Sequence, residues 1–195
     1  MIILICGFSA SGKSYLVNSV AKELGYKPVH TSDILRQLAC GVPESKILLA
    51  NTRMNTGWYE FSGLDKRRQK SKALDKRLDN YLIRLVETRD NLVLDSWTLP
   101  YLVKGNKNIL KIWLSATAKE RAKRMALRDS ISYSKAYKIL REKDEFSKAL
   151  FHNLYGFTLG KDKKIFDLVL DTNKLSIKEV EVKTVRFLKA KLKLR

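Results

Sequence analysis

The chain has 195 residues, of which 45% are hydrophobic, so it can bury the core of one domain and is not a disordered chain. Its 39 Lys and Arg against 20 Asp and Glu give a net charge of +19, which predicts a surface that attracts polyanions. No uninterrupted apolar run reaches the length of about 18 residues that a membrane span needs, and the first apolar run lacks the flanks of a signal peptide. We therefore expect a cytoplasmic protein without membrane contact.

The first predicted element is the apolar strand at residues 2–6, which runs directly into the stretch "GFSASGKS". Its spacing fits the phosphate loop G-x-x-x-x-G-K-[ST], in which backbone N–H groups wrap the phosphates of a nucleotide. Lys13 would reach the β- and γ-phosphates, and Ser14 would bind Mg²⁺. Apolar residues at helical spacing follow, so a helix should begin near Lys13. The residues assigned to ATP binding in this loop are Gly7, Ser9, Ser11, Gly12, Lys13 and Ser14.

Further strands alternate with helical stretches along the chain, which predicts a parallel sheet covered on both faces. The candidate strands are 2–6, 28–31, 91–95, 109–114 and 166–171. Helical segments are predicted at about 41–89, 117–155 and 176–192, the last with a capping box that starts at Ser176. The first two of these insertions follow strands two and four, where parallel sheets place ligands. The expected architecture is a single α/β domain over residues 1–195, a P-loop NTPase three-layer sandwich with a substrate-binding helical insertion (41–89) and a lid (116–155).

Two polar stretches follow predicted strands at this same edge of the sheet. "NLVLDSW" ends a buried strand in Asp95, which would hold Mg²⁺ or its water shell, or else would cap the next helix. "TSDILR" follows the second strand. Its Asp33 and Arg36 would contact the acceptor, or else Thr31, Ser32 or Asp33 would cap the next helix. The planar guanidinium of Arg36 suits an acceptor phosphate.

Arginines recur at spacings of three and four in "KERAKRMALRD", so Arg121, Arg124 and Arg128 should share one helix face. We assign Arg121 to bound ATP, and Arg124 and Arg128 to the charge that develops on the migrating phosphoryl group. Arg141 on the predicted return helix would complete this clamp. The alternative is an ordinary solvated helix face.

Basic residues gather at 65–77 and at 183–195. They indicate either solvated helix faces or a contact with RNA or the ribosome, and charge alone does not separate the two. Trp58, Tyr59 and Trp97 would line an acceptor pocket by stacking on a base, or belong to the core.

In these segments the chain resembles the nucleoside monophosphate kinases, specifically the archaeal-type cytidylate kinases, nearly from end to end. The similar stretches are the phosphate loop, "VHTSDILR", "LVLDSW", "LSATAKERAKRMALRD", "LREKDEFSKALFHNLYG" and "FDLVLDTNKLSIKEV". The resemblance implies ATP-dependent phosphoryl transfer to a nucleoside monophosphate, a five-stranded parallel sheet, a helical substrate-binding region and an arginine-rich lid. The implied cofactors are ATP and Mg²⁺, and the implied partner is a small nucleotide acceptor, with a CMP-like acceptor favoured.

The chain departs from the family pattern mainly on the acceptor side. Trp97 stands where the family has an arginine, Ala10 replaces a common loop glycine, and the stretch 148–151 keeps a single cation, Lys148. These departures and the charge leave two alternative functions open: an RNA- or ribosome-associated ATPase or nucleotide-gated binding protein, and a kinase of polynucleotide 5′-hydroxyls. The latter would need a base such as Asp33 or Asp95.

Overall fold

The computed structural model describes residues 1–49, 68, 71–103 and 105–193. Its centre is a five-stranded sheet in which all pairings are parallel, with strand order β2-β3-β1-β4-β5. The strands are β1 (Ile2–Cys6), β2 (Lys27–His30), β3 (Leu92–Asp95), β4 (Ile109–Ser115) and β5 (Leu168–Asp171). The five strands that the sequence predicts are thus confirmed, with shifts of at most two residues at their ends.

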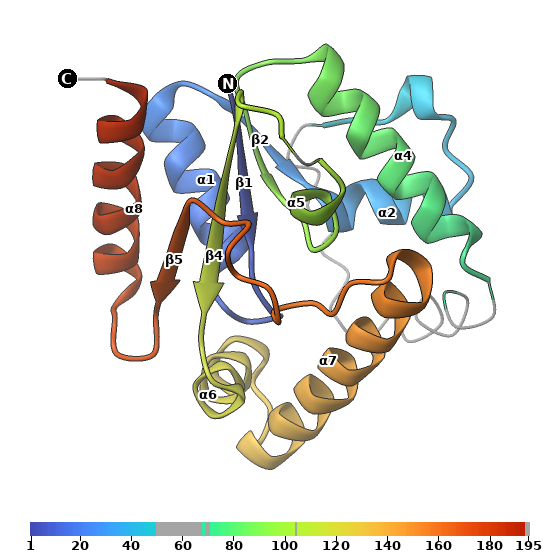
Figure 1. The fold of residues 1–195 in the computed structure, drawn as a ribbon. Coiled ribbons are helices and arrows are strands. Elements are labelled where there is room, and N and C mark those ends of the chain that lie inside the picture. The colour runs from blue at the N-terminus through green and yellow to red at the C-terminus, as the bar shows by residue number, and fades with distance from the viewer. Residues whose placement is uncertain (50–67, 69–70, 104, 194–195) are drawn as a thin grey trace.

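Helices cover both faces of this sheet and close its carboxyl edge (Figure 1). In chain order they are α1 (Lys13–Leu24), α2 (Thr31–Ala39), the short 3₁₀ helix η1 (Glu44–Lys46), α4 (Ala73–Thr88), α5 (Leu99–Leu102), α6 (Ala118–Asp129), α7 (Tyr133–Tyr155) and α8 (Ile177–Leu192). Helices α1 and α8 lie on one face, α2 and α4 on the other, and α6 and α7 lie beyond the carboxyl ends of the strands. The predicted three-layer α/β sandwich is confirmed.

Strand β1 is buried on both sides because it lies at the middle of the sheet. Ile2 and Leu4 point into the core beneath α2 and α4, and Ile3 and Ile5 point into the core beneath α1 and α8. A strand that is buried on both faces reads as a continuous apolar run, which is the pattern of residues 2–6. The phosphate loop that follows therefore starts from the end of a fully buried central strand.

The helical segment expected at 117–155 consists of two helices, α6 and α7, and Arg141 lies on the second of them, the predicted return helix. Ser130 ends α6 in the left-handed conformation (φ 53), and the side chain of Ser132 caps α7 by accepting a hydrogen bond from the backbone N–H of Lys135. The two helices share a small core of their own, formed by Ala122, Met125, Ala136 and Leu140. The capping box predicted at Ser176 is present in α8.

Within the expected insertion at 41–89, the structure describes η1, Arg68 and α4. Trp58 and Tyr59, which the sequence nominates for an acceptor pocket, lie outside the described residues. In the part of the chain that the structure does describe, no helix has the length and apolar character needed to cross a membrane.

Candidate active site

The loop from Gly7 to Ser14 joins β1 to α1 and has a backbone that requires glycine. Gly7 has φ +149, and a Cβ there would lie 2.6 Å from the carbonyl oxygen of Leu114 and 2.8 Å from Oγ of Ser11. Gly12, at φ +98, has open space where its Cβ would be. The loop thus packs tightly against β4 at its start and leaves room beside the start of α1, where a phosphate fits.

Two side chains of the loop, Lys13 and Ser11, have hydrogen-bond donors that could bind an anion. The Lys13 ammonium donates to the carbonyl oxygens of Gly7 and Phe8, at 2.7 and 2.9 Å. Burial lowers the pKa of Lys13, while the negative charge of Asp95 acts in the opposite direction. Oγ of Ser11 is buried and has no hydrogen-bond partner, an arrangement that a bound phosphate oxygen would satisfy. The residues present therefore fit a nucleotide phosphate.

Asp95 lies at the end of β3, opposite the start of α1, and is almost fully buried. Its carboxylate accepts hydrogen bonds from the backbone N–H and the hydroxyl of Thr31, both at 2.9 Å, and lies 3.4 Å from Oγ of Ser14. Burial acts to raise the pKa of Asp95, but hydrogen bonding and charge from His30, with the charge of Lys13, hold it below its ordinary value. An ionised carboxylate beside a serine hydroxyl suits Mg²⁺, which keeps water and phosphate oxygens as its other ligands.

The structure adds residues to this site that sequence reasoning did not assign. Nδ1 of His30 donates to Asp95 at 3.1 Å, and Nε2 lies 3.1 Å from the side-chain oxygen of Asn18 on α1. His30 thus connects β3 to α1 and fixes one oxygen of the carboxylate. The sequence did contain a signal for His30: it is near the end of a predicted strand, directly before "TSDILR", and therefore lies at the edge of the sheet where ligands bind.

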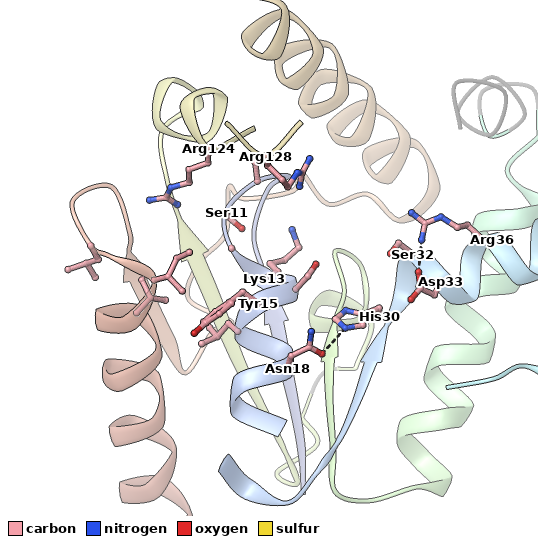
Figure 2. A pocket seen from close by; sticks show the side chains of 17 residues that line it. Ser11, Lys13, Tyr15, Asn18, His30, Ser32, Asp33, Arg36, Arg124 and Arg128 are labelled. Atoms are coloured by element: carbon pink, nitrogen blue, oxygen red, sulfur yellow. Dashed lines mark hydrogen bonds and ion pairs between the residues drawn. The ribbon is translucent and has the colours of Figure 1, made fainter. Parts of the chain in front are cut away.

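A cavity of about 710 Å³ opens beside the phosphate loop. Figure 2 shows Lys13 near its middle, with Tyr15 and Arg124 toward one end and Asp33 and Arg36 toward the other. Apolar side chains at the start of α8 complete the wall near Tyr15, namely Leu175, Ile177 and Val180. The cavity therefore combines an apolar end with a cationic centre.

A smaller cavity of about 230 Å³ adjoins the first, because Lys13, Ser14 and Arg128 line both. Trp97 lines the smaller one, and its indole N–H donates to the carbonyl oxygen of Gly7 at 2.7 Å. The buried carboxylates Asp75 and Asp79 also line it; Asp75 is paired with Arg68, and Asp79 accepts hydrogen bonds from Thr98 and Tyr155. Burial raises the pKa of Asp79 to about 6.

Arg121 does not share the cavity face with the other arginines of α6. Its guanidinium forms a two-pronged ion pair with Asp144 of α7, at 3.2 and 2.5 Å, and also donates to the carbonyl oxygen of Ser9 at 3.1 Å. The side chain is 3% exposed and lies over the ring of Phe8. This buried pair takes up the donors that we had assigned to ATP, so we propose a positioning role for Arg121 instead.

The remaining clamp arginines divide into two groups. Arg124 and Arg128 line the larger cavity, where Arg124 donates to Thr172 and Arg128 is paired with Asp129. Arg141 instead is exposed, is paired with Glu145 one turn along α7, and is not among the residues that line either cavity. The structure therefore does not bring Arg141 to the site.

Asp33 and Arg36 both line the larger cavity and form an ion pair with each other. Burial raises the pKa of Asp33, and the nearby positive charge of Arg36 partly offsets this. Arg36 can thus bind an anion in the cavity, but the anion would compete with Asp33 for its guanidinium.

The sheet order and the phosphate loop define a P-loop kinase fold. A solved shikimate kinase from Bacteroides thetaiotaomicron has the same fold, with a TM-score of 0.59 at 14% identity over 100% of this chain and 99% of that one. The family model for the cytidylate kinase-like family matches residues 2–174, and the chain belongs to this family.

Curated relatives agree with this assignment. A protein named cytidylate kinase from Sulfurisphaera tokodaii is 31% identical over 180 residues, which covers 92% of this chain and 91% of the relative. Another of the same name, from Pyrobaculum islandicum, is 30% identical over 179 residues, covering 92% of this chain and 88% of the relative. The predicted family resemblance is confirmed.

Proposed function

We propose that this chain is an ATP-dependent kinase that transfers the γ-phosphoryl group to a nucleoside monophosphate, with CMP as the favoured acceptor. The observation that carries the proposal is the pair of adjoining cavities that share Lys13 and Ser14. The larger cavity suits ATP, with its base at the apolar end near Tyr15 and its phosphates at Lys13. The smaller cavity suits the acceptor. The names of the curated relatives support a cytidine nucleotide.

The chemistry follows from the charges around the shared wall. Lys13 would exchange the carbonyl oxygens of Gly7 and Phe8 for the β- and γ-phosphates, and Ser11 would gain a partner for its hydroxyl. Ser14 and Asp95 would hold Mg²⁺, which, when bound, neutralises charge on the phosphates. The acceptor phosphate is already an anion, so the transfer needs no general base.

Water is the competing acceptor for the phosphoryl group, so the proposed mechanism needs a cover over the site that excludes it. We propose that α6 and α7 form the lid, with Arg124 and Arg128 directed at the phosphates, and that the region 41–89 contributes to the acceptor side. Arg128 is suited to the reacting centre because it lines both cavities.

The test is ADP release from Mg-ATP with CMP, dCMP, UMP, AMP, GMP or a short RNA as acceptor. Lys13→Ala is the blank; it is expected to abolish transfer while the far-UV circular dichroism spectrum and the urea midpoint stay close to those of the wild type. Strong stimulation by one monophosphate, with a diphosphate product, is the expected outcome. Stimulation by RNA alone, or hydrolysis indifferent to every acceptor, would refute the proposal and favour the RNA-associated alternative.

A further inference from the structure

The smaller cavity has one end shared with the donor site and another end formed by α4. Lys13, Ser14 and Arg128 line both cavities, so the acceptor phosphate must lie at this shared end to meet the γ-phosphoryl group. Among the described residues, Leu78 and Asp79 of α4 line only the smaller cavity. The nucleoside of a monophosphate bound in this way therefore extends toward α4 and toward Asp79.

The carboxylate of Asp79 is buried but keeps acceptor capacity. The residue is 2% exposed, its Oδ1 accepts a hydrogen bond from the hydroxyl of Thr98, and its Oδ2 accepts one from the hydroxyl of Tyr155 at 2.6 Å. An ionised carboxylate has lone pairs for about four hydrogen bonds, so each oxygen can accept one more. A ligand that presents an N–H group to this carboxylate can supply that bond, and a ligand that presents an oxygen cannot.

The second carboxylate on this wall, Asp75, already has a cationic partner. Nε and Nη2 of Arg68 donate to it at 2.7–3.2 Å, which makes a buried ion pair. Asp79 instead receives its two hydrogen bonds from neutral hydroxyls, and the charge of Arg68 acts on its pKa more weakly than burial does. Asp79 is therefore the carboxylate of the α4 wall that is better placed to accept a hydrogen bond from a ligand.

We propose that Asp79 accepts a hydrogen bond from the exocyclic amino group of cytosine and so selects CMP over UMP, a role that rests on the proposed function. Cytosine carries an amino donor at the position where uracil carries a carbonyl oxygen. Bound UMP would place that oxygen against the carboxylate, so that two buried acceptors would face each other without a proton between them. A site built to hydrogen-bond one substrate rejects an analogue that lacks the matching group.

The surroundings of Asp79 hold the carboxylate in place and offer apolar contacts to a base. Thr98 directly precedes α5 and Tyr155 ends α7, so two elements besides α4 fix the carboxylate. Apolar and aromatic side chains line the same cavity, namely Leu35, Leu78, Trp97 and Phe151. A pyrimidine ring can pack on these side chains while its polar edge meets Asp79.

The test measures the affinities of CMP, dCMP and UMP by isothermal titration calorimetry at pH 8, where a carboxyl group with a pKa of about 6 is ionised. The wild type is expected to bind CMP at least tenfold more tightly than UMP. In Asp79→Asn this ratio should fall to about threefold or less, because the amide has a donor for uracil and an acceptor for cytosine. ATP affinity, measured in parallel, reports on whether each variant is folded.

Two control variants separate recognition of the base from a purely structural role. Tyr155→Phe removes a hydrogen bond from Asp79 but leaves the carboxylate, so it should keep the wild-type ratio of CMP to UMP affinity. Glu87→Gln makes the same change of charge about two turns further along α4, at an exposed residue that lines neither cavity, and should also match the wild type. If Asp79 only held helices together, Tyr155→Phe and Asp79→Asn would weaken CMP and UMP binding alike.

Other results would overturn the inference. An unchanged ratio of CMP to UMP affinity in Asp79→Asn, an equal loss for both ligands, or a wild type that binds them equally would each refute it. So would a change confined to the ratio of CMP to dCMP, since it would assign the carboxylate to the ribose. If the wild type shows the expected ratio and Asp79→Asn loses it, but no CDP forms from Mg-ATP and CMP, the proposed function alone fails. Transfer to CMP and UMP with a ratio of kcat/KM values that Asp79→Asn leaves unchanged would refute the role of Asp79 alone.

Discussion

Replacing Asp144 with asparagine is expected to remove about 3 kcal/mol from the free energy of unfolding. The substitution preserves shape and leaves the guanidinium of Arg121 buried, at 3% exposure, without its counter-charge. Breaking a buried pair by removing one partner costs about 3–5 kcal/mol. The lower end applies because Arg121 keeps its hydrogen bonds to the carbonyl oxygens of Ser9 and Ala116.

The neighbouring residue provides the control. Glu145 pairs with Arg141 on the same helix, but these side chains are 63% and 55% exposed, so Glu145→Gln should cost less than about 1 kcal/mol. Urea unfolding at pH 7, followed by far-UV circular dichroism, measures both variants. Equal losses in the two variants would show that burial of the Arg121–Asp144 pair does not govern its contribution.

Two further predictions concern the pH dependence of stability and the phosphate loop. The pKa of Asp79 is about 6 in the folded protein, raised from its ordinary 3.8, so between these pH values the folded state binds a proton that the unfolded state does not. Relative to Asp79→Asn, the wild type should therefore lose up to about 3 kcal/mol of unfolding free energy as the pH rises from 4 to 7, and a flat difference in urea titrations would contradict this. Gly7→Ala should lower the free energy of unfolding by at least about 2 kcal/mol because its Cβ would clash with the Leu114 carbonyl. Gly12→Ala, with open space, should cost less, and equal urea midpoints would argue against this difference.

Local sequence patterns were enough to predict the sheet and the set of residues that lie together around the phosphate loop. The apolar run before Gly7, the spacing to Lys13 and the acidic end of the strand at Asp95 are each contained in one short segment, and the structure brings the three together. The start of α8 was predicted from the capping box at Ser176 for the same reason.

Contacts between distant segments could not be predicted in this way. Helical spacing places Arg121 on a face, but its partner Asp144 comes from another helix, and only the packing of α6 on α7 selects it. The hydrogen bond from Trp97 to Gly7 joins residues 90 positions apart, and that from His30 to Asp95 joins residues 65 apart. Nothing in the sequence near these side chains specifies such partners.

The methyl group of Ala10 connects the phosphate loop to helices α6 and α7 by packing. Ala10 has φ 60, a left-handed conformation that costs a non-glycine residue about 1–2 kcal/mol. Its side chain packs against the small core shared by α6 and α7. Lifting these helices would uncover the methyl group while the strain in the loop remained. We therefore expect the opening of the proposed lid, α6 and α7, and a loosening of the phosphate loop to occur as one event, so that product release and lid motion share a single barrier.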